Sequence, residues 1–134
     1  MKNDLTVSGK RKTAIARASI SDGKGAVTIN KIPFKFLSYI QRMMIEEPLI
    51  IAQEQLGELV FNISVNVRGG GQESQIDASR LAIAKAIVAF TKSDKLKKAY
   101  LAYDRNLLVA DVRRKETYKP GDSKARAKRQ KSYR

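Results

Sequence analysis

Alternating apolar and polar residues predict two β-strands, because successive side chains of a strand point to opposite faces of a sheet. One run lies between residues 13 and 20, and the other lies between residues 58 and 68. Their apolar faces consist of Ala14, Ala16, Ala18 and Ile20 in the first run and of Leu59, Phe61, Ile63, Val65 and Val67 in the second. The first face is unusually small, so we expect another element to approach that strand closely.

Two shorter strands are predicted at Thr6–Val7 and at Val27–Ile29. Residues 22–25, which precede the second of them, read Asp-Gly-Lys-Gly. This composition is typical of a hairpin turn, because glycine accepts positive φ without a steric penalty. We therefore expect strand 27–29 to return beside strand 13–20, and we expect Pro33 to end it.

Apolar residues at helical spacing predict a helix after residue 35. These residues are Phe36, Ile40, Met43 and Met44. Pro48 disfavours helical backbone at the residue before it, so we expect this helix to end at Glu47. Proline suits the first turn of a helix and glycine suits the residue after the last, so a second helix is expected between Pro48 and Gly57.

A third helix is predicted after residue 74. Residues 74–77, Ser-Gln-Ile-Asp, have the form of a capping box, which marks the start of a helix. The pattern extends to about Thr91 and is apolar around most of the circumference, so we expect this helix to be the buried central one. Ser93 is expected to cap a shorter helix.

The chain is strongly basic, with 27 Lys and Arg against 13 Asp and Glu and a net charge of +14. Residues 113–134 contain ten of the basic and two of the acidic side chains, and only Tyr118 and Tyr133 offer appreciable apolar surface there. With so little apolar area to bury, this segment is not expected to fold on its own. We therefore predict a globular domain over residues 1–112 and an extended basic tail over residues 113–134, which waits for a polyanion.

Several classes of chemistry lack the residues they need. The chain contains neither cysteine nor histidine, which excludes disulfides, thiolate chemistry, most structural zinc sites and the usual near-neutral acid–base group. Glu46 and Glu47 are adjacent, but neighbouring residues of a helix point in different directions and do not form a catalytic pair. We expect no enzyme, no metal or cofactor and no homo-oligomer. The chain shows neither a signal-peptide run nor the roughly 20 apolar residues of a membrane span, so we expect a soluble intracellular protein.

Two clusters are candidates for phosphate binding. Residues 10–12, Lys-Arg-Lys, follow Gly9 but lack the glycine spacing of a nucleotide-binding P-loop, so we reject nucleotide hydrolysis and keep a solvated turn as the alternative. Arg68 precedes the triple glycine of residues 69–71, where the unpaired N–H groups of a helix start attract anions. The alternative is that these glycines serve only to turn the chain sharply.

Three stretches carry a family resemblance. Residues 69–78, Gly-Gly-Gly-Gln-Glu-Ser-Gln-Ile-Asp-Ala, are the most specific of them, and the match continues through Ala82, Ala84, Lys85, Ala86 and Ile87. The other two are residues 9–17 and the segments 111–116, 119–121 and 124–126. Together they resemble the family of small-subunit ribosomal protein nine over nearly the whole chain. The last five residues are similar to the archaeal and eukaryotic form of that family.

The resemblance implies an α+β fold, a two-layer sandwich of a four-stranded mixed sheet and helices. This fold is similar to the second domain of ribosomal protein five and contains a left-handed β-α-β crossover. The resemblance also implies a structural constituent of the small ribosomal subunit in the cytoplasm. Its globular part would bind rRNA in the head beside neighbouring ribosomal proteins, and its basic tail would approach the peptidyl-site tRNA.

The site residues expected from this resemblance fall into two groups. The expected rRNA-binding residues are Lys10, Arg11, Lys12, Arg17, Arg68, Gly69, Gly70, Gly71, Arg113, Arg114, Lys115, Lys119, Lys124, Arg126, Lys128 and Arg129. The expected tRNA-binding residues are Lys131, Tyr133 and Arg134.

Other functions would use the same charge. A DNA-compacting or general nucleic-acid-binding protein is the main alternative, and an equal preference for duplex DNA and structured RNA would support it. A membrane-surface protein would need an amphipathic basic helix, for which the tail has too few apolar residues. For residues 113–134 the plainest alternative is a segment that only keeps the protein in solution.

Overall fold

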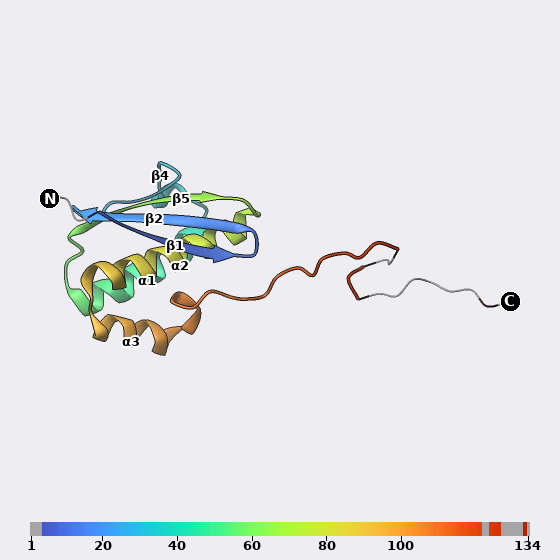
Figure 1. Cartoon of the computed structure of the whole chain (residues 1–134). Helices are drawn as coiled ribbons and strands as arrows, with labels where there is room; N and C mark the ends of the chain where they lie inside the picture. Colours follow the sequence, from blue (N-terminus) through green and yellow to red (C-terminus); the bar gives the residue numbers. More distant parts are fainter. Residues whose placement is uncertain (1–3, 122–123, 127–132, 134) are drawn as a thin grey trace.

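Helices cover one face of a mixed β-sheet (Figure 1). The computed structural model describes residues 4–121, 124–126 and 133. Within these residues the sheet has five strands: β1 (Leu5–Arg11), β2 (Ala14–Asp22), β3 (Val27–Ile29), β4 (Ile32–Pro33) and β5 (Phe61–Arg68). The helices are α1 (Tyr39–Leu56), α2 (Gln72–Thr91) and α3 (Asp94–Tyr103), and two short 3-10 turns are η1 (Phe34–Phe36) and η2 (Arg105–Leu107). The predicted α+β class is confirmed.

The strand order is β1-β2-β5-β3-β4, so β5 lies between β2 and β3. It runs antiparallel to β2 and parallel to β3. The hairpin predicted at residues 22–25 is therefore wrong. The physical reason lies in Asn62 of β5, whose side-chain oxygen accepts hydrogen bonds from the backbone N–H groups of Lys24 and Ala26, each at 3.0 Å. These bonds hold the turn against β5, and β3 does not return beside β2.

The sheet has one strand more than the four that were expected. Strand β4 pairs with β3 in antiparallel register, Ile29 opposite Ile32, across a two-residue turn formed by Asn30 and Lys31. Both turn residues have positive φ, 50° and 68°, which suits the twist of a tight hairpin. Pro33 therefore ends β4 and not β3. Strands β3 and β5 are parallel neighbours joined through α1, which forms a β-α-β unit; the left hand of its crossover stays a prediction.

Helix α1 continues through Pro48, so the prediction that one helix ends at Glu47 and another begins is wrong. Its buried residues lie on both sides of the proline and are Ile45, Pro48, Leu49 and Ala52. Packing of this stripe against the core outweighs the local preference of proline. Helix α3 reinforces the packing, because the buried hydroxyl of Tyr100 donates a 2.7 Å hydrogen bond to the carbonyl oxygen of Pro48. The helix ends at Gly57, as predicted.

Helix α2 has Gly71 as its N-cap, so the capping box predicted at residues 74–77 lies inside the helix. The two preceding glycines have positive φ, 78° and 68°, and they complete the turn from β5 before residue 74 is reached. The rest of the prediction is confirmed, because α2 ends at Thr91 and most of its apolar side chains are buried. Ser93 caps α3, as expected. In the described part of the chain, the helices are too short or too polar to cross a membrane.

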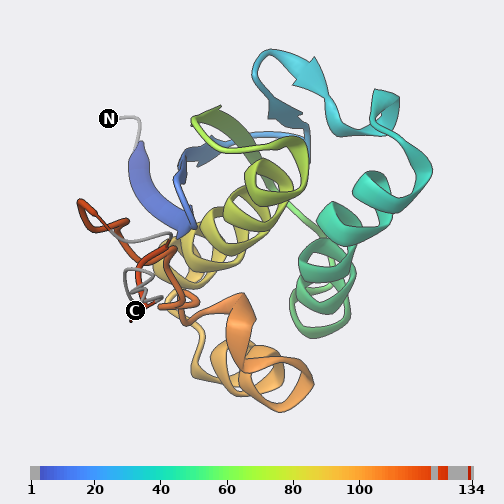
Figure 2. The same ribbon diagram turned by 90° about the vertical axis from the view of Figure 1, so that its right-hand side faces the viewer.

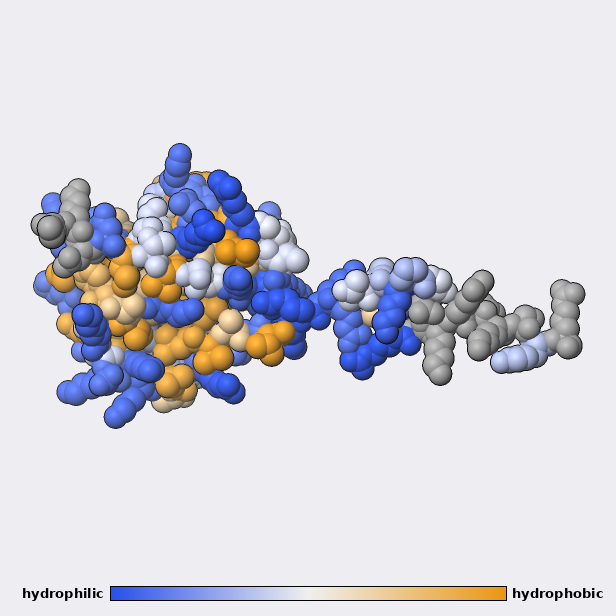
Figure 3. All heavy atoms as spheres, viewed as in Figure 1, coloured by the Kyte–Doolittle hydropathy of each residue, from blue (hydrophilic) through white to orange (hydrophobic). Residues whose placement is uncertain are grey.

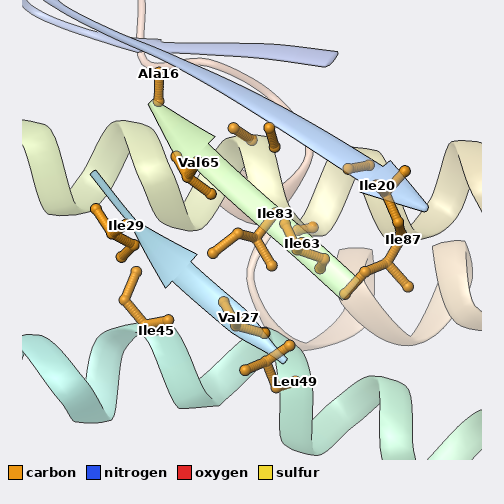
Figure 4. Packing of buried hydrophobic residues seen from close by; sticks show 14 of the residues in the cluster. Ala16, Ile20, Val27, Ile29, Ile45, Leu49, Ile63, Val65, Ile83 and Ile87 are labelled. Carbon is orange, nitrogen blue, oxygen red and sulfur yellow. The ribbon is translucent and has the colours of Figure 1, made fainter. Parts of the chain in front are cut away.

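The core lies between the sheet and the layer formed by α1 and α2 (Figure 4). Ile29 of β3 faces Ile45 of α1, whereas Ile20 of β2 faces Ile87 of α2. Helix α3 packs against α1 and α2 on the side away from the sheet (Figure 1). One face of the sheet is thus covered, and the other carries mainly polar side chains, with Ile15 as an exposed apolar residue among them.

Helix α2 lies almost in contact with the backbone of β1 and β2. The contact surface is built of fully buried alanines: Ala14, Ala16 and Ala18 of β2 and Ala78 and Ala82 of α2. Gly9 of β1 occupies the tightest point. A Cβ atom on this glycine would lie 2.6 Å from the carbonyl oxygen of Ala78 and 2.8 Å from the backbone nitrogen of Ala82. The expectation that another element approaches the alanine face closely is confirmed.

The close contact at Gly9 predicts the effect of a single methyl group. Gly9→Ala is expected to destabilise the fold by about 1–3 kcal/mol, because the added Cβ meets backbone atoms that cannot rotate away. Ser8→Ala, at an exposed position one residue earlier, should change the free energy of unfolding by less than about 0.5 kcal/mol. Urea unfolding of the two variants measures the difference. Equal stabilities would show that α2 does not seat against β1 at this point.

Candidate nucleic-acid interface

The sheet face that the helices leave uncovered, which we call the open face, gathers cations at one end. Lys10 of β1 lies opposite Ile15 of β2, and Ile15 lies opposite Arg68 of β5. Two residues further along, Arg17 lies opposite Asn66. Directly opposite residues of neighbouring strands share a face, so Lys10, Arg17 and Arg68 converge although they are distant in sequence. All three side chains are exposed.

A hollow of about 770 Å³ lies at this cationic end. It is lined by Thr13, Ile15, Arg17, Asn30, Lys31, Asn66, Arg68 and Gly69. These lining residues include three cations and no carboxylate, so they attract an anion in the hollow and none of them repels it. Arginine can bind a phosphate through two parallel hydrogen bonds.

Lys31 is a residue of the hollow that the sequence analysis missed. It reaches the open face because the turn before it is fixed to β5: the backbone N–H of Asn30 donates to the Val65 carbonyl oxygen at 2.7 Å. The side-chain oxygen of Asn30 also accepts from the N–H of Val67 at 3.0 Å. An asparagine followed by a lysine between two isoleucines is the local signal of this turn. It becomes informative about Lys31 only once β3 is known to lie beside β5.

Further along the open face, uncharged hydrogen-bonding groups replace the cations. Thr6, Ser19 and Ser64 form a cross-strand row that continues to Thr28. The hydroxyl oxygens of Thr6 and Ser19 lie 3.2 Å apart. This row lines a second hollow of about 500 Å³, which also takes in the carboxylate of Asp4. The hydroxyls suit sugar and phosphate oxygens, but the cationic end is the stronger site for an anion.

The triple glycine lies beside the cationic end, and backbone geometry explains two of its three residues. A Cβ atom on Gly69 would lie 2.7 Å from the carbonyl oxygen of Thr13, and one on Gly70 would lie 3.1 Å from the backbone nitrogen of Ala14. A Cβ atom on Gly71 would meet nothing within 4 Å. Sharp turning therefore accounts for Gly69 and Gly70. Gly71 leaves space at the start of α2, where N–H groups favour an anion.

The tail leaves the domain beside a cluster of ion pairs that we call the tail root: Arg11, Asp77, Asp111 and Arg113. The Nη1 atom of Arg11 lies 3.3 Å from Oδ2 of Asp111, and its Nε atom lies 3.7 Å from Oδ2 of Asp77. The Arg11 and Asp111 side chains are each only 18% exposed. The guanidinium of Arg11 thus lies beside two carboxylates of the domain, and its expected rRNA contact stays a prediction. Lys10 is exposed beside it.

Asp111 is held from its other side by Arg113. Nη2 of Arg113 donates to Oδ2 of Asp111 at 2.7 Å, and the backbone N–H of Arg113 donates to Oδ1 at 2.9 Å. These hydrogen bonds, together with the charges of Arg113 and Arg11, hold the pKa of the Asp111 carboxyl well below its usual range. A depressed pKa means that the two arginines interact with the ionised carboxylate of Asp111. Their interaction is therefore present at neutral pH and is lost only as the pH falls through that low pKa.

The described part of the tail is exposed and hydrophilic (Figure 3). Residues 112–121 form neither helix nor strand. Glu116 pairs with Arg126, and the Lys115 Nζ atom lies 4.7 Å from the centroid of the Tyr118 ring. Exposed pairs of this kind contribute little to stability. These cations can therefore exchange their present partners for phosphates.

The expected tail contacts lie partly within the described residues. Exposed side chains there are Arg113, Arg114, Lys115, Lys119, Lys124, Arg126 and Tyr133. The remaining expected contacts, Lys128, Arg129, Lys131 and Arg134, lie outside the described residues. Lys12 is exposed in the turn between β1 and β2, where it has a φ of 53°.

A sheet with one covered face, one cationic open face and a basic C-terminal extension suits a nucleic-acid-binding scaffold, and this is the class of protein that the fold and the site define. Comparison with known proteins is more specific. Residues 9–134 match the family described as ribosomal protein S9/S16. The small ribosomal subunit proteins uS9 of Methanococcus vannielii and Methanococcus maripaludis are each 50% identical over 130 residues, which cover 94% of this chain and 95% of the relative. That of Methanothrix thermoacetophila is 48% identical over 128 residues, 95% of this chain and 96% of the relative.

The chain therefore belongs to the ribosomal protein S9/S16 family. This confirms the resemblance that the sequence motifs carry. Proteins of this family are structural components and not enzymes, so the prediction that the chain is not an enzyme is also confirmed.

The tail root predicts how one substitution changes the start of the tail. Arg11→Gln removes the charge that faces Asp111 from the domain side, so backbone order parameters of residues 109–113 should fall from about 0.85 toward about 0.6. Lys97→Gln, an exposed control on α3 with the same loss of charge, should leave them unchanged. NMR relaxation of the full chain at neutral pH measures both. Equal order parameters in the two variants would contradict an anchoring role for Arg11.

Proposed function

We propose that this protein is a structural constituent of the small ribosomal subunit in the cytoplasm. Residues 1–112 form a domain that binds rRNA in the head of the subunit, and residues 113–134 form a tail that approaches the peptidyl-site tRNA. The observation that carries the proposal is the cationic hollow of the open face, which has three cations and no carboxylate among its lining residues. Membership of the ribosomal protein S9/S16 family supports rRNA as the polyanion.

The open face would bind the RNA backbone by charge and hydrogen bonding. Arg17 and Arg68 are fixed by the register of β2 and β5, so they present a constant spacing to phosphates. Lys31 adds a third charge from the β3–β4 turn. Contacts of this kind orient the protein and carry little sequence information, which is appropriate for a part of a larger assembly.

The tail would order only when RNA surrounds it. Its described cations are exposed, and their intramolecular pairs are weak enough to be replaced. The tail root fixes the direction in which the chain leaves the domain, because Asp111 is held between Arg11 and Arg113. Arg134 and Lys131 at the far end are proposed to reach the tRNA together with Tyr133, whose ring is 88% exposed and suited to stacking on an unpaired base.

The open face predicts a loss of salt-dependent RNA affinity. Arg17→Gln combined with Arg68→Gln should weaken binding of the full chain to an rRNA fragment from the small-subunit head. The slope of log affinity against log salt should become less steep by about 1.4–1.8, because two phosphate contacts are lost. Filter binding over a series of salt concentrations measures the slope.

A matched control lies on α3, where Lys97 and Lys98 are exposed. Lys97→Gln combined with Lys98→Gln removes the same charge and should change the slope by less than half as much. A control effect as large as that of the arginine pair would mean that only net charge matters. Equal affinity of the unaltered chain for duplex DNA would favour the DNA-compacting alternative.

The tail predicts a separate effect on tRNA. Deleting residues 123–134 removes six basic and no acidic side chains. The domain should unfold at the same temperature, and the shortened chain should still enter small subunits, but these subunits should hold peptidyl-site tRNA severalfold more weakly. A full-length control with the same six cations replaced by Gln separates charge from length. Unchanged tRNA affinity in both would refute the proposed role of the tail.

A further inference from the structure

Several large apolar side chains around η1 and the start of α1 are exposed, and they are not among the residues that line the cationic hollow of the open face. We call this group the η1–α1 patch, and its members are Ile32, Phe36, Tyr39, Ile40 and Met43, with exposed fractions of 52%, 80%, 76%, 67% and 49%. Monomeric proteins rarely leave so many large neighbouring apolar side chains in water unless they bind something there. Figure 2 shows β4 and η1, in cyan, at the opposite edge of the body from β1, in blue.

The fold of this chain does not need the patch. Helix α1 faces the core with a different stripe, in which Ile45 and Ala52 are fully buried. In the segment that precedes α1, Phe34 and Leu37 pack against the core, whereas Phe36 between them points outward. The apolar spacing of Phe36, Ile40 and Met43, which predicts a helix from the sequence, therefore belongs to an exposed surface.

The charges around the patch indicate what can cover it. Lys31, Lys35 and Arg42 are exposed along its length, and the nearby acid Glu46 accepts a 2.9 Å hydrogen bond from Nε of Arg42. A second copy of the chain would bring the same cations, and the basic tail would bring more, so both are repelled. An acidic partner is attracted.

Two features favour a protein over RNA as the partner. Phe36 and Tyr39 have aromatic faces, but the other three of the five members, Ile32, Ile40 and Met43, offer neither a face for stacking nor a hydrogen bond to a base or phosphate. Aromatic residues, methionine and arginine side by side are the composition of the centre of a protein–protein interface. Phe36 and Tyr39 are the most exposed members and would fill pockets of the partner.

We propose that the η1–α1 patch docks a neighbouring protein of the small ribosomal subunit through an apolar segment flanked by Asp or Glu. This rests on the proposed function, because the partner is met in the assembled subunit. The patch adjoins the open face at Lys31, but its apolar members are not among the residues that line the cationic hollow, so the protein partner and rRNA can be bound at the same time.

A photo-cross-linking experiment tests the proposal in the assembled particle. Phe36 is replaced by benzoylphenylalanine in the full chain, the chain is incorporated into small subunits, and the cross-linked product is digested with ribonuclease or protease. The expected product is a cross-link to a protein at a segment rich in Asp or Glu. The same probe at Asn66, on the open face, should cross-link to rRNA.

A cross-link from position 36 to rRNA, or no cross-link from it, would overturn the proposed docking of a protein. An rRNA cross-link from position 66 in the same experiment would still support the proposed function. If neither variant enters the subunit, both proposals fail.

A pair of substitutions measures how much the patch contributes to binding of the neighbouring protein. Phe36→Ser combined with Tyr39→Ser should reduce, at least tenfold, the amount of the neighbouring protein that stays on salt-washed subunits. This neighbour is the protein that the cross-link identifies, and it is not cross-linked in this experiment. Tyr103→Ser, at an exposed aromatic position on α3, is the matched control and should change the retained amount less than twofold. Lys35→Glu should reduce it by a smaller factor than the pair of serines, because it opposes only the acidic flank. Retention that is unchanged in the Phe36→Ser and Tyr39→Ser chain, with thermal unfolding also unchanged, would contradict the proposal.

Discussion

The close seating of α2 on β1 and β2 determines much of the rest of this structure. Alanines on the helix and the strand, together with Gly9, let the helix backbone approach the sheet so closely that a Cβ atom on Gly9 would lie 2.6 Å from the carbonyl oxygen of Ala78. Interiors of this density respond to a single added methyl group. The same contact also places Asp77, the residue before Ala78 on α2, beside Arg11 of β1. A packing constraint in the core thus positions a charged cluster at the surface.

That arrangement separates three kinds of surface. Because α1 and α2 cover one face of the sheet, the opposite face keeps Lys10, Arg17 and Arg68 in water. Asp77 and Asp111, which would weaken an anion site if they lay on the open face, are instead occupied at the tail root. The apolar side chains that the core does not use gather around η1 and the start of α1. The charges proposed to bind RNA, the anchor of the tail and the apolar members of the proposed docking surface are therefore formed by different side chains.

Much of the local structure could be predicted from the sequence, because it depends on short-range patterns. The inward and outward faces of β2 and β5 follow from a period of two, and the run of alanines indicates that another element packs closely on β2. What could not be predicted depends on contacts between distant segments. The turn that leads past β5 is held to it by Asn62 and by backbone hydrogen bonds, and α1 continues through Pro48 in contact with buried neighbours and with Tyr100.

The residues of the candidate site likewise fall into those that the sequence predicts and those that require the tertiary structure. Arg17 and Arg68 were found because their outward positions follow from strand alternation. Lys31 was missed because its place on the open face requires the parallel pairing of β3 and β5. Arg11 looked like its neighbours in the sequence, but its pairing opposite Ala14 places it on the covered face of the sheet, where it meets Asp111. Local composition identifies cations, and only the tertiary structure shows which of them remain free for a ligand.

The central claim is that the open face of the sheet is the side that meets rRNA, while the helix layer faces elsewhere. The chain contains no cysteine, so a single cysteine can carry an iron chelate that cleaves nearby RNA with hydroxyl radicals. Small subunits assembled with Asn66→Cys, on the open face, should show strong and localised rRNA cleavage, and those assembled with Lys98→Cys, on α3, should show much weaker cleavage. Equal cleavage from the two positions, or stronger cleavage from α3, would contradict the claim.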